Sequence, residues 1–295
     1  MNRNAYILLL LTTLFWGGNA IAGKLAVGHV SPLLLTTLRW AFALAILAVI
    51  GWPRLRNDWP VVRRHLVLLT ILGALGFAVF NIALYSALKY TSAINVSIEQ
   101  AGMPMAIFLA NFLIFRTRVT WMQMTGFVLS IVGIAIVASH GDPARLLKLD
   151  LNFGDALMLV AIVVYSAYTV ALRVKPEIHW QSLMIVLCAA AFATSVPFTV
   201  AEFSYGAGIW PDMRGWAIVA YTVLFPSLLA QVFYIRGVEM IGANRAGLFI
   251  NLVPIFGTLL SIVILGEAFE AYHAVAIVLV MGGIGLAEAS GRKVA

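Results

Sequence analysis

A few ionisable and amide side chains lie inside long apolar stretches of this chain, and Glu99 is the clearest case. A carboxylate in such surroundings must be neutral, paired with a cation or in contact with water. Glu99 is therefore predicted either to contact an ammonium group or to carry a proton. The alternative is a structural ion pair with Arg39 or Lys24. Gln100 is adjacent in sequence and cannot share a helix face with Glu99, so we expect only one of the two to face a cavity.

Aromatic and amide side chains recur at helical spacing in two other apolar stretches. Trp16, Asn19 and Gly23 share a helix face, and Tyr165 and Tyr168 do likewise. Aromatic faces and amides together suit the binding of amino acids or planar metabolites. Ordinary aromatic packing is the alternative for each of these residues.

Two prolines are predicted to lie in the middle of apolar helices. Pro104 and Pro254 would each remove a backbone hydrogen bond and free a carbonyl group. Kinked helices of this kind form gates and walls of binding sites, although a static kink is also consistent with the pattern. The full set of candidate ligand-contacting residues is Trp16, Asn19, Phe80, Glu99, Gln100, Met103, Tyr165, Tyr168, Gln231 and Asn251.

Catalytic chemistry has little support in the sequence. The five histidines lie at or beyond the ends of apolar stretches, and no zinc-ligand spacing, Gly-x-Ser-x-Gly turn or phosphate-binding loop occurs. The single cysteine, Cys188, excludes an intramolecular disulfide. We expect no enzyme activity, no catalytic residue, no metal site and no cofactor.

The composition requires a lipid environment. The chain has 295 residues, of which 62% are hydrophobic and 11% charged, with a mean hydropathy of +0.99. Soluble domains have roughly 25% charged residues, so much of this surface must face lipid. The net charge of +7 does not indicate nucleic-acid binding, because the basic residues lie in short gaps between apolar runs.

The apolar runs predict an all-α polytopic membrane protein, since each span needs about 20 apolar residues. No connection is long enough for a folded soluble domain, so any function is expected inside the helix bundle. The ten predicted helices cover residues 5–27, 32–52, 65–88, 91–115, 120–138, 153–173, 181–201, 214–238, 243–265 and 272–290.

Lysine and arginine predict the orientation of the spans. With the N-terminus in the cytoplasm, thirteen of the 19 basic residues lie on the cytoplasmic side, and Arg39 lies within a span. This bias favours cytoplasmic termini and an even number of spans. The first span resembles a signal peptide, but we expect it to be retained, because it belongs to the repeat described next. The remaining five basic residues are Lys24, Lys89, Arg145, Lys148 and Arg214.

The two halves of the chain can be superimposed in sequence. The stretch from Phe15 to Lys24 matches the stretch from Val164 to Arg173 at an offset of 149, and residues 87–104 match 237–254 at an offset of 150. Five spans per half is an odd number, so the second half must be inverted in the membrane. Inverted repeats are typical of secondary transporters, whose two halves exchange conformations around a central site. We place this site where the first, third, fourth, sixth, eighth and ninth helices meet.

Several motifs resemble the EamA family of the drug/metabolite transporter superfamily. They are Phe15-Trp16-Gly17-Gly18-Asn19, the helices containing Pro104 and Pro254, Leu265-Gly266-Glu267, and Gly282-Gly283-Ile284-Gly285. The resemblance covers nearly the whole chain and looks closest to the YddG-type amino-acid exporters. It implies ten helices in two inverted five-helix repeats, a central cavity and metabolite export. The first repeat departs from the pattern, with Phe115-Arg116-Thr117 in place of Leu265-Gly266-Glu267.

The resemblance and the repeat together imply a secondary transporter of the bacterial inner membrane. We expect it to export aromatic or neutral amino acids and related metabolites by alternating access, with repeats at residues 1–140 and 150–292. Proton coupling and passive uniport are both open. The alternatives are export of purines, quaternary cations or another class of metabolite, or a non-transport membrane protein. Expected partners are the small-molecule substrate and membrane lipid, and the chain is expected to be a monomer or weak homodimer.

Overall fold

The computed structural model describes residues 3–116, 120–142, 152–241, 246 and 249–291. Eight helices are long and apolar enough to cross a membrane, and two shorter apolar helices complete the bundle. The helices are α1 (Arg3–Ala26), α2 (Pro32–Arg64), α3 (Leu66–Gly73), η1 (Ala74–Val79), α4 (Phe80–Ala87), α5 (Ala93–Gln100), α6 (Met103–Phe115), α7 (Trp121–Ala138), α9 (Phe153–Ala171), η2 (Leu172–Val174), α10 (Trp180–Ser204), α11 (Met213–Thr222), η3 (Val223–Leu229), α12 (Ala230–Ile241), α14 (Val253–Leu260), η4 (Ser261–Leu265) and α15 (Ala271–Gly291).

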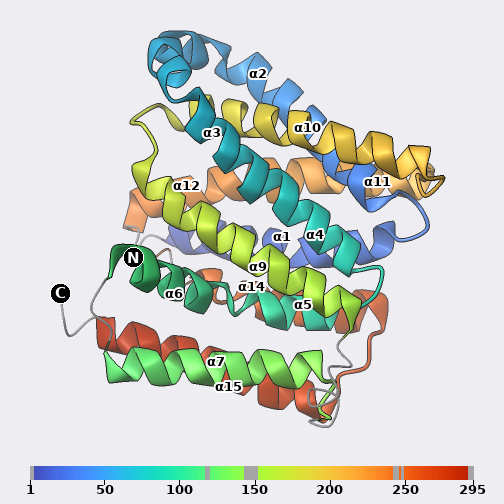
Figure 1. Ribbon diagram of the computed structural model, residues 1–295, viewed down its shortest axis with the longest axis vertical. Helices are drawn as coiled ribbons and strands as arrows, with labels where there is room; N and C mark the ends of the chain where they lie inside the picture. The colour runs from blue at the N-terminus through green and yellow to red at the C-terminus, as the bar shows by residue number, and fades with distance from the viewer. Residues whose placement is uncertain (1–2, 117–119, 143–151, 242–245, 247–248, 292–295) are drawn as a thin grey trace.

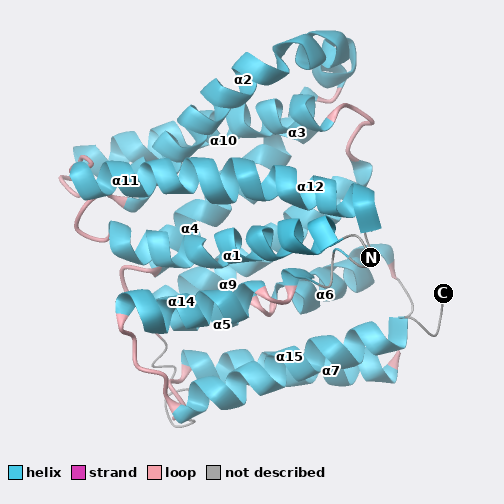
Figure 2. Cartoon of the chain, turned by 180° about the vertical axis from the view of Figure 1, so that it is seen from behind, coloured by secondary structure: helices cyan, strands magenta, loops and turns pink. Residues whose placement is uncertain are grey.

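The helices form a bundle in which equivalent parts of the two halves lie together. Helix α2 packs along α10 at one edge, and α7 packs along α15 at the opposite edge (Figure 1). Helices α1 and α9 and the shorter helices α3 to α6, α11, α12 and α14 fill the space between these edges. The start of α1 and the end of α15 lie at the same end of the bundle in both views (Figures 1 and 2).

The predicted all-α fold is confirmed, and most predicted boundaries agree within a few residues. The second helix is the exception, because it was predicted to end at residue 52 and α2 continues to Arg64. Its extension contains Pro53, Pro60 and several charged side chains. Hydropathy predicts where the apolar part of the helix ends, whereas the helical backbone hydrogen bonds of α2 continue beyond that point. The first part of the predicted helix 243–265 falls largely outside the described residues.

Two of the three π-helical segments in the described part of the chain, η1 and η3, occupy equivalent places in the two halves. Segment η1 joins α3 to α4, and η3 joins α11 to α12, so that each interrupts a long helix near its middle. A π-helical turn contains an extra residue and leaves carbonyl groups without their regular partners, and it frequently marks a functional site. Hydropathy and the repeat pattern gave no indication of either segment.

The prediction that Pro104 and Pro254 kink the middle of continuous helices is wrong. Each proline lies in the first turn of a separate half-helix, α6 or α14. A proline at that position loses nothing, because the first N–H groups of a helix have no intrahelical partner. The fourth and ninth segments are therefore broken helices, with the breaks at residues 101–102 and 251–252.

Small residues allow close contacts between helices. An added Cβ at Gly283 would lie 2.4 Å from the carbonyl oxygen of Gly126, so α15 and α7 touch through their backbones. At Gly17 on α1, an added Cβ would lie 2.8 Å from the backbone nitrogen of Gly257 on α14. Both contacts join the first half of the chain to the second.

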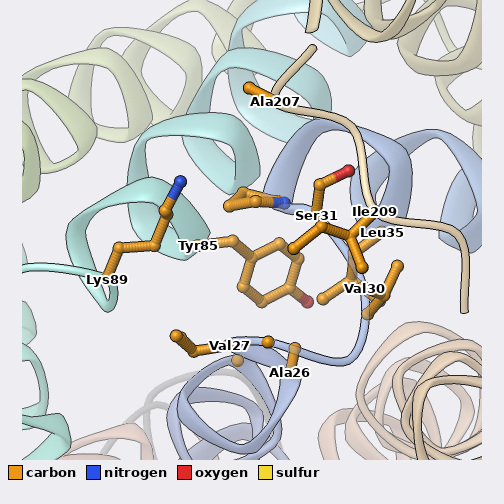
Figure 3. A pocket seen from close by; sticks show the side chains of 12 residues that line it. Ala26, Val27, Val30, Ser31, Leu35, Tyr85, Lys89, Ala207 and Ile209 are labelled. Atoms are coloured by element: carbon orange, nitrogen blue, oxygen red, sulfur yellow. The ribbon is translucent and has the colours of Figure 1, made fainter. Parts of the chain in front are cut away.

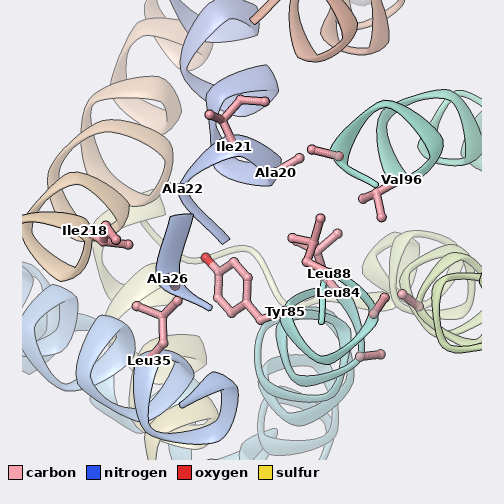
Figure 4. Close-up of a cluster of buried hydrophobic side chains, with 14 of the residues drawn as sticks. Ala20, Ile21, Ala22, Ala26, Leu35, Leu84, Tyr85, Leu88, Val96 and Ile218 are labelled. Atoms are coloured by element: carbon pink, nitrogen blue, oxygen red, sulfur yellow. The ribbon is translucent and has the colours of Figure 1, made fainter. Parts of the chain in front are cut away.

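A buried cluster of hydrophobic side chains surrounds α1 and holds Tyr85 at its centre. The ring of Tyr85 is 1% exposed and packs among residues of α1, α2 and α4 that include Ala22, Leu35 and Leu88 (Figure 4). Burial of this aromatic residue fixes the position of its hydroxyl group, which is one part of the polar network described below.

Candidate functional site

A buried arginine is the centre of a side-chain hydrogen-bond network that joins several helices. Arg39 of α2 is 5% exposed. Its Nε donates to Ser227 Oγ of η3 at 2.7 Å, and its Nη1 donates to Asn19 Oδ1 of α1 and Asn81 Oδ1 of α4, each at 2.9 Å. Nη1 also donates to the hydroxyl of Tyr85, which donates to Asn19 Oδ1 at 2.8 Å. One guanidinium thus connects four helical segments from both halves.

Tryptophan side chains hydrogen-bond to carbonyl groups of the two π segments. The indole of Trp40 donates to the carbonyl of Phe77 at 3.1 Å, and that of Trp16 donates to the carbonyl of Pro226 at 3.2 Å. These carbonyls occupy corresponding places in η1 and η3. The predicted site residue Trp16 therefore has a defined structural contact, and its ring also packs against Tyr234 at 5.5 Å.

Three of the predicted aromatic residues lie together between α4 and α9. The rings of Phe80 and Tyr165 are 4.9 Å apart, and those of Tyr165 and Tyr168 are 5.5 Å apart. Tyr168 lies on the face of Gly76, where an added Cβ would be 2.3 Å from the ring. The π segment η1 and this aromatic cluster are therefore in direct contact.

Glu99 does not pair with either of the basic residues considered from the sequence. It is 0% exposed, and both carboxylate oxygens lack a hydrogen-bond partner among the described residues. Lys24 instead donates to the carbonyls of Leu88 and Thr91, and the network above occupies Arg39. The charged group that acts on Glu99 is a second buried carboxylate, Asp155.

Asp155 lies in the first turn of α9 and is also 0% exposed. It faces Thr91 and Asn95 of the neighbouring segment. The amide oxygen of Asn95 accepts from Nε2 of His273 at 3.1 Å, and Nδ1 of His273 accepts from the backbone N–H of Glu270 at 2.9 Å. These two bonds define a neutral imidazole tautomer. Polar groups from α5, α9 and α15 thus gather around two buried carboxylates.

The remaining predicted residues are spread around the centre of the bundle. Met103 packs against the cluster that contains Tyr85. Gln100, Gln231 and Asn251 are half-buried, and no described hydrogen bond joins the two glutamines to the Arg39 network. The structure therefore brings Asn19 to Arg39, Phe80 to the two tyrosines, and Glu99 to Asp155, in three separate groups.

The central position of Arg39 and its partners Asn81, Tyr85 and Ser227 was not predicted from the sequence. The signal was present, because Arg39 is the basic residue that the span count left inside a helix. A charged residue inside a span is a candidate functional residue by default. Its partners are short polar side chains that a hydropathy profile does not distinguish from their apolar neighbours.

A small cavity leads from one end of the bundle to Tyr85. Ser31 and Lys89 are among its lining residues, and the 205–212 connection covers it through Ala207 and Ile209 (Figure 3). The backbone N–H of Ser31 donates to the carbonyl of Ile209 at 3.2 Å. The cavity volume is about 20 Å³, whereas a single water molecule needs about 10–15 Å³. The route to the centre is thus closed to a metabolite in this conformation.

Glu267 holds the start of a half-helix of the opposite repeat. Its Oε1 accepts from the backbone N–H of Ala93 and its Oε2 from that of Ile94, each at 2.9 Å. These N–H groups belong to the first turn of α5 and have no intrahelical partner. A carboxylate at a helix N-terminus is also favoured by the helix dipole. Glu267 thus links the connection before α15 to the broken helix that carries Glu99.

We expect Glu267→Ala to lower the free energy of unfolding by roughly 1–2 kcal/mol, the usual range for loss of a helix N-terminal cap. Thermal unfolding of the purified protein would measure the change. Glu270→Ala is the matched control, because the described contacts of Glu270 use its backbone N–H and not its carboxylate. Equal destabilisation by the two variants would contradict the capping role.

The two halves of the chain each match one protein-family model. The EamA-like transporter family matches residues 3–139 and again residues 152–288. The chain belongs to the EamA-like transporter family. The family places it among transporters and not enzymes. The two EamA repeats account for the paired π segments and the paired broken helices described above.

Relatives with curated names extend over almost the same length. The chain is 26% identical to "Uncharacterized transporter YyaM" of Bacillus subtilis, over 95% of this chain and 92% of the relative. It is 25% identical to "Uncharacterized transporter YetK" of the same organism, over 95% and 85%. "Uncharacterized inner membrane transporter YicL" of Salmonella typhimurium is 21% identical, over 99% and 97%. These EamA relatives support membrane transport without a named substrate.

A solved crystal structure shares the EamA fold of this chain. It aligns over 100% of this chain and 99% of its own length, with a TM-score of 0.64 and 22% sequence identity. At this identity the likeness supports the fold and does not extend to substrate or mechanism.

Proposed function

We propose that this protein is a secondary transporter that exports aromatic or neutral amino acids and related metabolites by alternating access. One observation carries the proposal: broken helices and π segments at equivalent places in the two repeats converge on buried polar side chains. Discontinuous helices near the middle of a bundle are a recurring way to build substrate sites in secondary transporters. The aromatic residues of α4 and α9 would supply apolar contacts to the substrate.

The proposed transport cycle moves the two repeats, placed at residues 1–140 and 150–292, against each other. The closed cavity below Ile209 represents one gate, and movement of α6 and α14, whose first turns contain Pro104 and Pro254, would open or close the other. Of the candidate residues, Asn19 contacts Arg39 directly and is the best supported substrate-contacting residue. Trp16, Phe80 and Tyr165 would form the walls of the site.

We also propose an inner-membrane location with both termini in the cytoplasm. The name of the Salmonella relative supports the membrane, and the bias of Lys and Arg supports the direction. The start of α1 and the end of α15 share one end of the bundle (Figure 2). The finer likeness to YddG-type exporters, and a monomeric or weakly dimeric state, belong to the same proposal.

Reconstituted liposomes test the transport function directly. We expect the purified protein to move radiolabelled threonine or methionine with a saturable rate and with counterflow, as a carrier does. A panel that adds purines and quaternary ammonium compounds distinguishes the other substrate classes. Flux no greater than in protein-free vesicles for every compound would refute the transport proposal.

A further inference from the structure

Arg39 is a permanent charge inside the bundle, since the guanidinium group does not lose its proton in proteins. It is 5% exposed and lies on α2 between α1, α4 and η3. A charge at this depth costs several kcal/mol unless it is compensated. The groups around Arg39 therefore determine which charge a ligand of this site must carry.

Every described hydrogen-bond partner of Arg39 is a neutral group. They are the amide oxygens of Asn19 and Asn81 and the hydroxyls of Ser227 and Tyr85. The ion pairs found among the described residues lie elsewhere, at His29–Asp212 and Arg236–Glu239. Neutral oxygens solvate the positive charge but do not balance it.

The buried carboxylates of the bundle have other surroundings. Asp155 of α9 is the charged group that acts on Glu99 of α5. Glu202 of α10 accepts the backbone N–H of Leu34 at 3.2 Å. The buried carboxylic acids of the described part therefore make no ion pair with the buried guanidinium of Arg39. A positive site of this kind remains without a counter-ion until a ligand brings one.

The guanidinium also has N–H donors, on Nη2, that no described residue accepts, whereas Nε and Nη1 are occupied. The planar fork of arginine matches the two oxygens of a carboxylate. The centre of the guanidinium also lies 4.8 Å from the ring centre of Trp40 and 6.0 Å from that of Tyr85. These rings hold the group in place and exclude water around it.

The cavity beside this site also favours an anion. It reaches Tyr85, whose hydroxyl hydrogen-bonds to Arg39, and Lys89 lies at its rim (Figure 3). None of its lining residues in the described part of the chain is acidic. A narrow passage with one sign of charge and apolar walls raises the local concentration of the opposite charge.

We propose that Arg39 binds the carboxylate of the transported molecule, so that the substrates are small carboxylic acids and amino acids. The inference rests on the proposed transport function and adds its substrate class. The ligand supplies the negative charge that the protein leaves out, and Asn19, Asn81, Tyr85 and Ser227 hold the guanidinium ready for it. Quaternary cations would be repelled at the same site, and neutral solutes would leave the charge of Arg39 unbalanced.

The test measures thermal stabilisation of the purified full chain by pairs of compounds that differ only in the acidic group. The pairs are threonine and threoninamide, methionine and methioninamide, phenylalanine and phenylalaninamide, and 3-phenylpropionate and 3-phenylpropanamide. A ligand that binds the folded state raises the unfolding temperature. We expect at least one carboxylate to raise it and its amide to have no effect.

Variants test whether Arg39 is the residue that distinguishes carboxylates from their amides. Arg39→Gln is expected to weaken carboxylate binding at least about tenfold, equivalent to about 1.4 kcal/mol, and Arg39→Lys is expected to retain part of it. Arg236→Gln is the matched control, because Arg236 is an exposed arginine on α12. If Arg39→Gln does not fold, the comparison of each carboxylate with its amide in the unaltered protein still decides the question.

Three results would overturn the inference. They are equal stabilisation by acids and amides, unchanged carboxylate binding in a folded Arg39→Gln protein, and no stabilisation by any acid of the panel. Liposome flux separates this failure from failure of the transport function. Flux of amides or cations without preference for acids would reject the carboxylate site and retain transport, whereas no flux of any solute would reject transport itself.

Discussion

Glu99→Gln is expected to abolish the response of transport to a pH gradient. An ionised carboxylate without a partner is too costly in this apolar surrounding, so Glu99 is neutral in the closed conformation described here. Opening of the bundle to water would let the group release its proton on one side. Glutamine has nearly the same shape and cannot carry a proton, so the gradient-driven component should fall at least about tenfold.

The measurement compares flux into liposomes with and without an imposed pH gradient. Glu239→Gln is the control, since Glu239 is an exposed carboxylate that pairs with Arg236. A second variant, Asp155→Asn, tests whether the two buried carboxylates share the proton. An unchanged pH response in folded Glu99→Gln protein would make Glu99 a structural residue and would favour passive uniport.

Gly17→Ala is expected to destabilise the protein by roughly 1–3 kcal/mol, the usual cost of overpacking. The new methyl group would lie 2.8 Å from the backbone nitrogen of Gly257 and 3.0 Å from the carbonyl oxygen of Val253. Backbone atoms cannot move aside as a flexible side chain can, so α1 and α14 must separate. Because the two helices belong to different repeats, transport should decline together with thermal stability.

Gly282→Ala gives a control with the opposite expected sign. Gly282 also lies in a helix, but an added Cβ there would meet no atom within 4 Å. Replacing a helical glycine by alanine in open space stabilises a protein by roughly 0.5–1 kcal/mol. Thermal unfolding of the two variants compares them directly, and destabilisation of equal size would show that the α1–α14 contact is not the cause.

The fold could be predicted from the sequence because its signals are long and redundant. Ten apolar runs predicted the helices, and the matching of residues 87–104, with Pro104, to residues 237–254, with Pro254, predicted the repeat. The end of α2 was missed because its charged and proline-containing extension looks like a loop in hydropathy. The segments η1 and η3 were missed because one extra residue in a helix of 22 or 29 residues changes neither composition nor periodicity enough to be seen.

The candidate site was predicted only in part, for a different reason. Sequence spacing shows which residues share a face of one helix, as with Trp16 and Asn19. It does not show which helices are neighbours, and Arg39 contacts Asn19, Asn81 and Ser227 from three different segments. The predicted ion pair of Glu99 with Arg39 or Lys24 depended on which helices are neighbours. In the structure, the charged group that acts on Glu99 is Asp155.

The π segments η1 and η3 differ in length, and this difference corresponds to one additional residue in the second half of the chain. Segment η1 has six residues and η3 has seven. Their first residues are 149 positions apart and their last are 150 apart, and 150 also separates the starts of the next equivalent helices, as in Met103 and Val253. An extra residue in a regular helix would rotate everything after it by about 100°. The longer bulge can absorb such an insertion, so a gene with one added codon can still encode a second repeat whose later helices present the same faces as the first.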